Sequence, residues 1–377
     1  MTTVFTHARK LDALGEVDDF WMLVDGETIT ATGSGEAPDA GTVVDLGGKW
    51  LTPGFIDLHG HGGGGFSFDN GPEEIVSALA VHRAHGTTRS VISLVANPLA
   101  DVRSSLESIA DLVDSDPLVL GSHLEGPYLA QERRGAHNPQ FLKEPSPFET
   151  EELIAAARGT LRQLTLAPEL PNALETIDVL VEAGVVVAIG HTAANFAQAQ
   201  AAFDRGARLV THVFNAMPGI HHRDPGPIIA AFEDERVVLE LVLDGDHVHP
   251  DVATMAFAQA PGRVALVTDS MAAAGFRDGD YSLGTLTVSV REGRALLRGT
   301  NTIAGSTLTL DRALRVAMSR SRIAPHVAVE ALTLTPARVL GLEHRHGLLA
   351  AGFVADAVAL DHDWQVSGVW ANGHSLS

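Results

Sequence analysis

The sequence contains no cysteine, and only three of its basic residues are lysines, Lys10, Lys49 and Lys143. Without cysteine the chain has neither disulfides nor thiolate metal sites, so any metal ion must be bound by His, Asp or Glu. No apolar run is long enough to cross a bilayer, and the first residues lack the apolar core of a signal peptide. The sequence therefore predicts a cytoplasmic protein without a membrane partner.

Positive charge is also scarce, because 26 Lys and Arg face 47 Asp and Glu, for a formal net charge of −21. Such a surface repels nucleic acid and anionic lipid, so neither is expected as a partner. An anionic substrate would need a local cluster of cationic side chains. The 377 residues, 45% of them hydrophobic, can form one large domain or a large domain with a small one.

The middle of the chain alternates apolar, β-branched runs with helix-like stretches. The eight apolar runs span residues 51–61, 87–97, 117–127, 162–170, 184–192, 207–216, 236–247 and 262–270. Helix-like stretches between them span residues 72–86, 148–158, 173–184 and 195–206. This alternation indicates a parallel sheet, and eight strands fit a closed (β/α)8 barrel. An open doubly wound sheet is less favoured, because no G-x-G-x-x-G turn follows the first strand.

Both ends of the chain have a different pattern, with short strand-like runs broken by turns such as Asp25-Gly26. Neither end can bury much apolar area alone, so we predict one small β-sandwich domain built from residues 1–50 and 346–377. The TIM-like barrel would then span residues 51–345. Residues 282–306 are rich in strand formers and are interpreted as a hairpin insertion after the eighth strand.

The stretch "FIDLHGHGGGG" at the first barrel strand places two histidines one residue apart and then a run of glycines. Residues i and i+2 of a strand point to the same side, so His59 and His61 can converge on one ion. The glycines would leave the barrel mouth open and let the backbone turn sharply.

Polar residues close the other predicted strands as well, and the C-terminal strand ends of a barrel share one mouth. These residues are Asn97, His123, Glu125, Glu169, His191, His212, Asp244, Asp246, His247 and Asp269. A single histidine at a strand end is most often structural, but several imidazoles and acids at one mouth indicate a metal site. Nitrogen and oxygen ligands favour Zn²⁺, and Fe²⁺ or Mn²⁺ also fit.

On these motifs the sequence resembles the amidohydrolase superfamily and, within it, the N-acetylglucosamine-6-phosphate deacetylases. The resemblance covers essentially the whole chain. It is carried by "PGFIDLHGHGGGG", "HLEGPYL", "GAHNPQF", "IGHT", "THVFNAMP", "HRDPGP", "DGDHV", "LVTDS" and "IAGSTLTL". It implies a metal-dependent barrel enzyme that releases acetate from N-acetyl-D-glucosamine 6-phosphate, in amino-sugar catabolism and cell-wall recycling.

The resemblance also implies the metal ligands. Glu125, His191 and His212 would hold the principal ion, and His59 with His61 would hold a second one, bridged by Glu125. Some members of the family lack the two histidines and work with one ion, so either one or two ions are possible in general. Other amidohydrolases bridge two ions with a carboxylated lysine, but none of the three lysines lies at a strand end.

Catalytic and substrate-binding roles follow from the same resemblance. A bound ion lowers the pKa of its water from about 15.7 to roughly 7. Asp269 would accept the proton of that water and return it to the leaving amine. Contacts to the substrate are expected from Ala136, His137, Asn215, Ala216, Arg223, His247, Ala304, Gly305 and Ser306. Arg223 can come from a neighbouring subunit, which implies a homodimer.

Two alternatives stay open. An enzyme of the same fold could act on another N-acyl amine, such as N-acetylgalactosamine 6-phosphate, which differs at C4 only. A non-catalytic barrel scaffold is the second alternative, but it would be expected to have lost some of the ligands. Arg133 and Arg134, near the mouth, could attract the phosphate of the substrate or could simply be exposed charges, and the sequence does not decide between these two roles.

Overall fold

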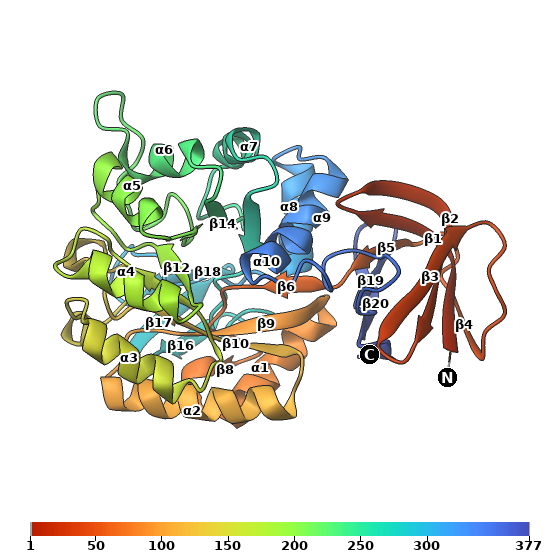
Figure 1. Ribbon diagram of the computed structural model, residues 1–377, viewed down its shortest axis with the longest axis horizontal. Coiled ribbons are helices and arrows are strands. Elements are labelled where there is room, and N and C mark those ends of the chain that lie inside the picture. The colour runs from red at the N-terminus through yellow and green to blue at the C-terminus, as the bar shows by residue number, and fades with distance from the viewer. Residues whose placement is uncertain (1, 377) are drawn as a thin grey trace.

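The computed structural model describes residues 2–376, so Met1 and Ser377, the outer ends of the predicted small domain, lie outside the described residues. The barrel and a second sheet lie side by side, with both chain ends in the second sheet (Figure 1). Within the described residues, no helix combines the length and apolar character needed to cross a bilayer.

The barrel consists of eight parallel strands, which coincide with the eight apolar runs, although one strand begins a residue before its run, at Leu161. They are β6 (Phe55–Asp57), β9 (Thr87–Leu94), β10 (Val119–Glu125), β11 (Leu161–Leu166), β12 (Val186–Ile189), β13 (Leu209–Val210), β14 (Val238–Val242) and β15 (Val264–Val267). Neighbours along the chain pair in order from β6 to β15. The ring closes where Asp269 N–H donates to His59 O at 2.8 Å and His61 N–H donates to Ser270 O at 2.7 Å. The predicted barrel is confirmed.

Helices surround these strands and cover their outer faces (Figure 1). They are α1 (Pro72–Ala84), α2 (Leu99–Ser115), α3 (Pro147–Ala156), α4 (Ala173–Glu182), α5 (Phe196–Asp204), α6 (Gly226–Glu233), α7 (Pro250–Gln259), α8 (Leu310–Ser319), α9 (Pro325–Leu332) and α10 (Leu334–Val339). The four predicted helices match α1, α3, α4 and α5. Helix α5 begins with a capping box, in which Asn195 and Gln198 exchange side chain to backbone hydrogen bonds.

The second sheet takes strands from both ends of the chain, as predicted. They are β1 (Thr2–Asp12), β2 (Gly15–Asp25), β3 (Thr28–Ser34), β4 (Thr42–Asp45), β5 (Trp50–Pro53), β19 (Ala357–Leu360), β20 (Val366–Ala371) and β21 (His374–Ser375). It has its own core around Phe5, Phe20 and Met22. A buried ion pair joins it to the barrel, because Arg89 of β9 donates to Asp356 at 2.7 and 2.9 Å.

Short elements complete the mouth of the barrel. They are β7 (Gly62–Gly63), β8 (Phe66–Ser67), the 3₁₀ turns η1 (Phe68–Asn70), η2 (Gln131–Arg133) and η3 (Pro139–Phe141), and β16 (Gly279–Leu283), β17 (Leu286–Arg291) and β18 (Arg294–Leu297). The insertion after the eighth strand thus has three antiparallel strands rather than one hairpin. The glycine run makes the predicted sharp turn: a Cβ on Gly62 would lie 2.3 Å from Phe66 O.

Candidate metal centre and substrate cavity

Four of the candidate donors occupy equivalent places in the barrel. His59, His191, His212 and Asp269 each lie two residues beyond the last residue of their strand, and Glu125 is the last residue of β10. The φ angles of His191, His212 and Asp269 are 47°, 28° and 45°, in the left-handed region that non-glycine residues seldom adopt. These turns direct the three side chains toward the axis of the barrel, and such strain is typical of functional sites.

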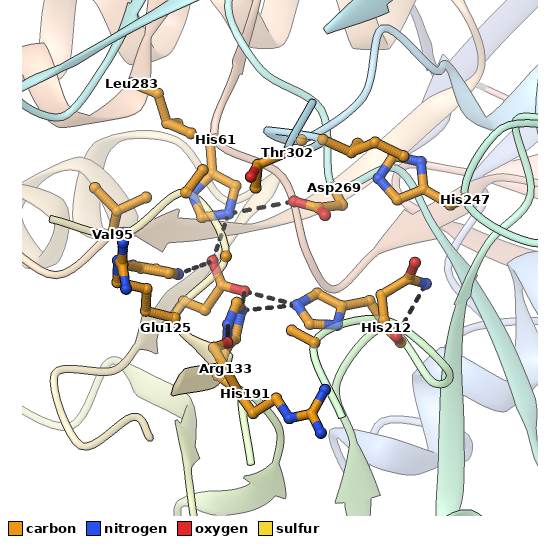
Figure 2. A pocket seen from close by; sticks show the side chains of 18 of the residues that line it. His61, Val95, Glu125, Arg133, His191, His212, His247, Asp269, Leu283 and Thr302 are labelled. Atoms are coloured by element: carbon orange, nitrogen blue, oxygen red, sulfur yellow. Dashed lines mark hydrogen bonds and ion pairs between the residues drawn. The ribbon is translucent and has the colours of Figure 1, made fainter. Parts of the chain in front are cut away.

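His59, His61 and Asp269 form the first group of donors (Figure 2 labels the last two). The Nε2 atoms of the two histidines are 3.1 Å apart. Asp269 Oδ1 lies 3.6 Å from His59 Nε2 and 3.5 Å from His61 Nε2. Three ligand atoms thus surround one point.

Glu125, His191 and His212 form the second group, which lies next to the first (Figure 2). Glu125 Oε1 lies 2.9 Å from His191 Nε2 and 3.0 Å from His212 Nε2. The other carboxylate oxygen, Oε2, lies 3.1 Å from His61 Nε2. Glu125 therefore faces both groups, as a bridging carboxylate must.

The hydrogen bonds behind the imidazoles fit them to a metal ion. His191 Nδ1 lies 2.8 Å from the carbonyl oxygen of Arg133, and His59 Nδ1 lies 3.0 Å from Glu240 Oε2. Carbonyl and carboxylate oxygens only accept, so in both rings Nδ1 carries the proton and Nε2 presents a lone pair to the centre. The loop that holds His191 needs Gly135, whose φ is 55° and whose Cβ would lie 3.1 Å from His191 Cε1.

Electrostatics in the centre favour a cation. Burial alone would raise the pKa of Glu125, but His59, His137 and His191 hold the pKa well below its usual value, so the carboxylate is ionised. Burial likewise opposes charge on His59, yet Glu125 and Asp269 raise its pKa well above the usual value. The two carboxylates that favour a proton on His59 would equally favour a divalent ion in the position of that proton.

His123 lies at the same mouth but does not join the centre. Its Nδ1 lies 2.9 Å from Ser93 Oγ and its Nε2 lies 2.9 Å from Thr165 Oγ1. Burial, together with the neighbouring imidazoles, lowers its pKa well below the usual value. His123 is therefore a neutral, structural histidine.

A cavity of about 530 Å³ opens over the metal centre. Six of the nine predicted substrate-binding residues line it: Ala136, His137, Asn215, Ala216, His247 and Gly305. The Ala96 N–H donates to His137 Nδ1 at 3.3 Å, so the proton of this ring sits on Nε2, which lies 3.3 Å from Glu125 Oε2. Burial lowers the pKa of His137, so this neutral ring can act as a hydrogen-bond donor in the cavity.

The other three predicted residues do not line the cavity. Ala304 and Ser306 are buried. Ser306 Oγ donates to Thr268 O at 2.6 Å and Ser306 N–H donates to Asp269 O at 2.7 Å, so Ser306 supports the segment next to Asp269. Arg223 is exposed, and its guanidinium lies 2.7 Å from His222 Nε2. Between β13 and α6 the chain first passes the cavity with His212, Asn215 and Ala216, and it then forms a loop that projects away from the barrel (green in Figure 1).

His247 has a partner that the sequence did not assign. Its Nδ1 lies 2.7 Å from Asp244 Oδ2, three residues earlier in the same loop. Burial would lower the pKa of His247, but the hydrogen bond and charge of Asp244 raise it above the usual value. Asp244 therefore favours the positively charged form of the His247 ring at this side of the cavity.

Further lining residues were missed or left open by the sequence. Arg133 and Arg134 both line the cavity, as do Leu283 and the segment 301–303 of the insertion. Glu240 was also missed, although one acid within the apolar run "VVLELVL" is an unusual feature that could have been noted.

Comparisons with known proteins agree on one family. Residues 50–376 match the model of the amidohydrolase family. The chain is similar to an N-acetylgalactosamine-6-phosphate deacetylase of Escherichia coli O157:H7, with 36% identity over 100% of both chains. It is 34% identical to an N-acetylglucosamine-6-phosphate deacetylase of Vibrio furnissii, over 92% of this chain and 88% of the relative.

Solved structures give the same picture. A mutant N-acetyl-D-glucosamine-6-phosphate deacetylase of Mycobacterium smegmatis, in complex with N-acetyl-D-glucosamine 6-phosphate, superposes with a TM-score of 0.95 and 40% identity, covering 100% of this chain and 99% of that one. The deacetylase of Thermotoga maritima gives a TM-score of 0.90 at 28% identity, covering 99% of both chains.

Proposed function

The chain belongs to the amidohydrolase family, and we propose that it hydrolyses the acetamide of N-acetyl-D-glucosamine 6-phosphate to D-glucosamine 6-phosphate and acetate. The observation that carries this function is the position of Asp269. Its carboxylate lies within 3.6 Å of two metal-binding imidazole nitrogens and lines the cavity. A proton-accepting group is thus held where water is activated.

The described residues divide the reaction among themselves. The divalent ion would be held by His59, His61, Glu125, His191 and His212, and it would supply Lewis-acid activation of water and of the acetamide carbonyl. Asp269 takes the proton of the attacking water and delivers it to the leaving amine, so that one carboxylate serves as base and then as acid. His137 donates from Nε2 to the substrate, either at the carbonyl oxygen or at the sugar.

The phosphate end of the substrate meets the cations of the cavity. The cavity is lined by Arg133, Arg134 and His247, whose charged form is favoured by Asp244. Asn215 and Ala216 contribute further contacts from the loop after β13. In this acidic chain, such a local cluster is what an anionic substrate requires.

Several finer assignments stay proposals. We propose two ions per chain, Zn²⁺ first and Fe²⁺ or Mn²⁺ as alternatives, in a cytoplasmic homodimer. Because Arg223 is exposed on a projecting segment, it would reach a phosphate only in the cavity of a neighbouring copy. Of the predicted substrate contacts at Ala304, Gly305 and Ser306, we keep the one from Gly305, because Gly305 lines the cavity. The division into residues 1–50 with 346–377 and residues 51–345 also stays a prediction.

A second substrate has a specific observation in its favour. The Escherichia coli relative named for N-acetylgalactosamine 6-phosphate matches over the whole chain. Acetate release should therefore be measured on both phosphorylated sugars and on both sugars without phosphate. We expect the gluco substrate with phosphate to give the highest kcat/KM. A higher kcat/KM for the galacto epimer would make N-acetylgalactosamine 6-phosphate the substrate. No acetate release from any of the four sugars would favour a non-catalytic scaffold.

A further inference from the structure

Glu240 lies deep in the barrel, in the middle of β14, with no exposed surface. Its neighbours Leu239 and Leu241 belong to the apolar core. Side chains alternate along a strand, so Glu240 points to the barrel interior while these two leucines point to the helices. A carboxylate there loses its hydration, which is costly unless it is paired.

Its two oxygens have one partner each among the described side chains. Oε2 accepts from His59 Nδ1 at 3.0 Å, and Oε1 accepts from Gln163 Nε2 at 2.8 Å. The first contact fixes the ring so that Nε2 faces His61, Glu125 and Asp269. The second contact holds the carboxylate itself, because Gln163 is also fully buried.

The two halves of the centre differ in what lies behind their imidazoles. The ring of His191 rests on a neutral backbone carbonyl. The Nδ1 atoms of His61 and His212 are buried without a partner in the part of the chain that the structure describes. His59 therefore differs from the other three rings, because its Nδ1 contacts a carboxylate.

The difference places an additional carboxyl group behind one half of the centre. Glu125 and Asp269 already lie in this buried region, and buried carboxylates are stabilised by nearby cations. Glu240 therefore adds to the preference for a cation on the His59 side of the centre.

We propose that Glu240 is a positioning residue that holds His59 in its metal-binding tautomer and keeps an ion resident at the His59, His61 and Asp269 group. The inference deepens the proposed two-ion function and rests on it. Carboxylates behind a ligating histidine typically change metal affinity by 10–100-fold. The same factor is expected here, confined to one of the two ions.

The test compares metal content and affinity of the full-length protein with those of Glu240→Gln, which keeps the size of the side chain. Each protein is loaded with Zn²⁺, passed through gel filtration, analysed for zinc per chain, and then titrated with a chromogenic chelator. We expect about two ions in the original protein. In the variant, one ion should bind 10–100-fold more weakly while the other is unchanged. Two ions held with unchanged affinity would overturn the proposal.

Two further variants separate positioning from general damage. Gln163→Met removes the second contact of Glu240 and should weaken the same ion by a smaller factor; if Glu240→Gln does not fold, unchanged zinc affinity here overturns the proposal. Asp311→Asn is the matched control, because Asp311 is buried and contacts His85 Nδ1 at 3.2 Å outside the cavity lining. It should keep both ions.

The zinc measurement tests the role of Glu240, and the acetate measurement tests the proposed function, so the two can be contradicted separately. If the original protein releases no acetate from any amino sugar but Glu240→Gln loses one ion, the function is wrong and the positioning role stands. If acetate is released and Glu240→Gln keeps both ions at full affinity, the function stands and the role of Glu240 is wrong.

Discussion

The layer beneath the metal centre in the barrel is made of polar side chains, whereas the core cluster of the terminal sheet is made of apolar ones. Beneath the metal centre the barrel encloses Ser93, His123, Gln163, Thr165, Thr211 and Glu240, all buried and polar. The core cluster of the sheet contains Phe5, Phe20, Met22, Ile29 and Leu51 instead. Barrel interiors are usually filled by branched apolar side chains, so this layer departs from the common pattern.

The difference shows that the barrel interior orients side chains beneath the metal centre at the expense of the stability that apolar packing would give. Thr165 Oγ1 lies 2.9 Å from His123 Nε2 and 2.7 Å from Thr211 Oγ1, and in the same layer Gln163 Nε2 donates to Glu240 Oε1 at 2.8 Å. Such a network fixes directions but adds little net stability, because each group also loses its hydration. The core cluster of the sheet is apolar, and the buried charges beside it form an ion pair, in which Lys10 Nζ lies 2.8 Å from Asp12 Oδ2. Four experiments can break or sharpen this contrast, taken in order of their effect on turnover.

Removal of metal should have the largest effect. Exhaustive dialysis against a chelator should abolish acetate release, and added Zn²⁺ should restore it. It should also lower the melting temperature, because ions bound only by the folded barrel contribute about 4 kcal/mol at 1,000 times their Kd. Calorimetry with and without zinc measures this. Full turnover in protein shown to be free of metal would contradict the assignment of the centre.

Replacing the proton carrier should have the next largest effect. Asp269→Asn keeps a ligand oxygen but cannot accept a proton, so kcat should fall by about 10²–10⁴. The melting temperature should change little, which steady-state kinetics and thermal unfolding together would show. Asp101→Asn, an exposed carboxylate on α2, is the control and should keep its kcat. Near-normal turnover by Asp269→Asn would remove the proposed proton transfer while leaving the family intact.

The sequence predicted the parts of the centre that depend on local order. Apolar runs give the eight strands, and their ends give His59, Glu125, His191, His212 and Asp269, because parallel strands end at one mouth. No local pattern says that Arg223 projects into solvent or that the insertion adds residues 301–303 to the cavity. These positions depend on loops whose course is set by packing across distant segments.

Glu240 shows that a residue acting on another strand of the barrel is also hard to predict from sequence. Its strand was predicted, but its role depends on β14 lying only two strands from β6, with β15 between them, and that follows from closure of the ring. Asp244 was named as a strand-end acid, yet its support of His247 needs a turn in which Asp244 Oδ1 accepts from the N–H of Asp246 and His247. Residues that act through another residue are therefore the hardest to find in a sequence.

The phosphate side of the cavity should show an intermediate effect that depends on pH. With Asp244 at Nδ1, only the protonated ring of His247 can also donate from Nε2 to a phosphate. Its pKa is raised above the usual value of about 6.5, so binding is complete below that pH and weakens as pH rises through the raised pKa. KM for the phosphorylated sugar should then rise about tenfold, as expected for a lost charge-assisted hydrogen bond.

A comparison of substrates and a variant make this measurement specific. The sugar without phosphate should show no such rise in KM, and His247→Asn should have a high KM at every pH. The pair also contributes to stability with the same sign, since a raised histidine pKa stabilises the fold below about pH 6.5 and this contribution is lost above the raised value. A KM that is flat with pH on the phosphorylated sugar would remove His247 from the phosphate site.

A cavity in the terminal sheet should have the smallest effect on turnover. Met22→Ala removes a fully buried side chain from that core and should lower the free energy of unfolding by about 2–5 kcal/mol. At a temperature where the variant is folded, kcat should stay unchanged, because the metal centre lies in the barrel. Val43→Ala, with 61% of Val43 exposed in the same sheet, should change neither value. A fall in kcat for Met22→Ala alone would show that the sheet also sets the geometry of the barrel mouth. The Arg89 and Asp356 pair, which joins the two, is the contact to replace next.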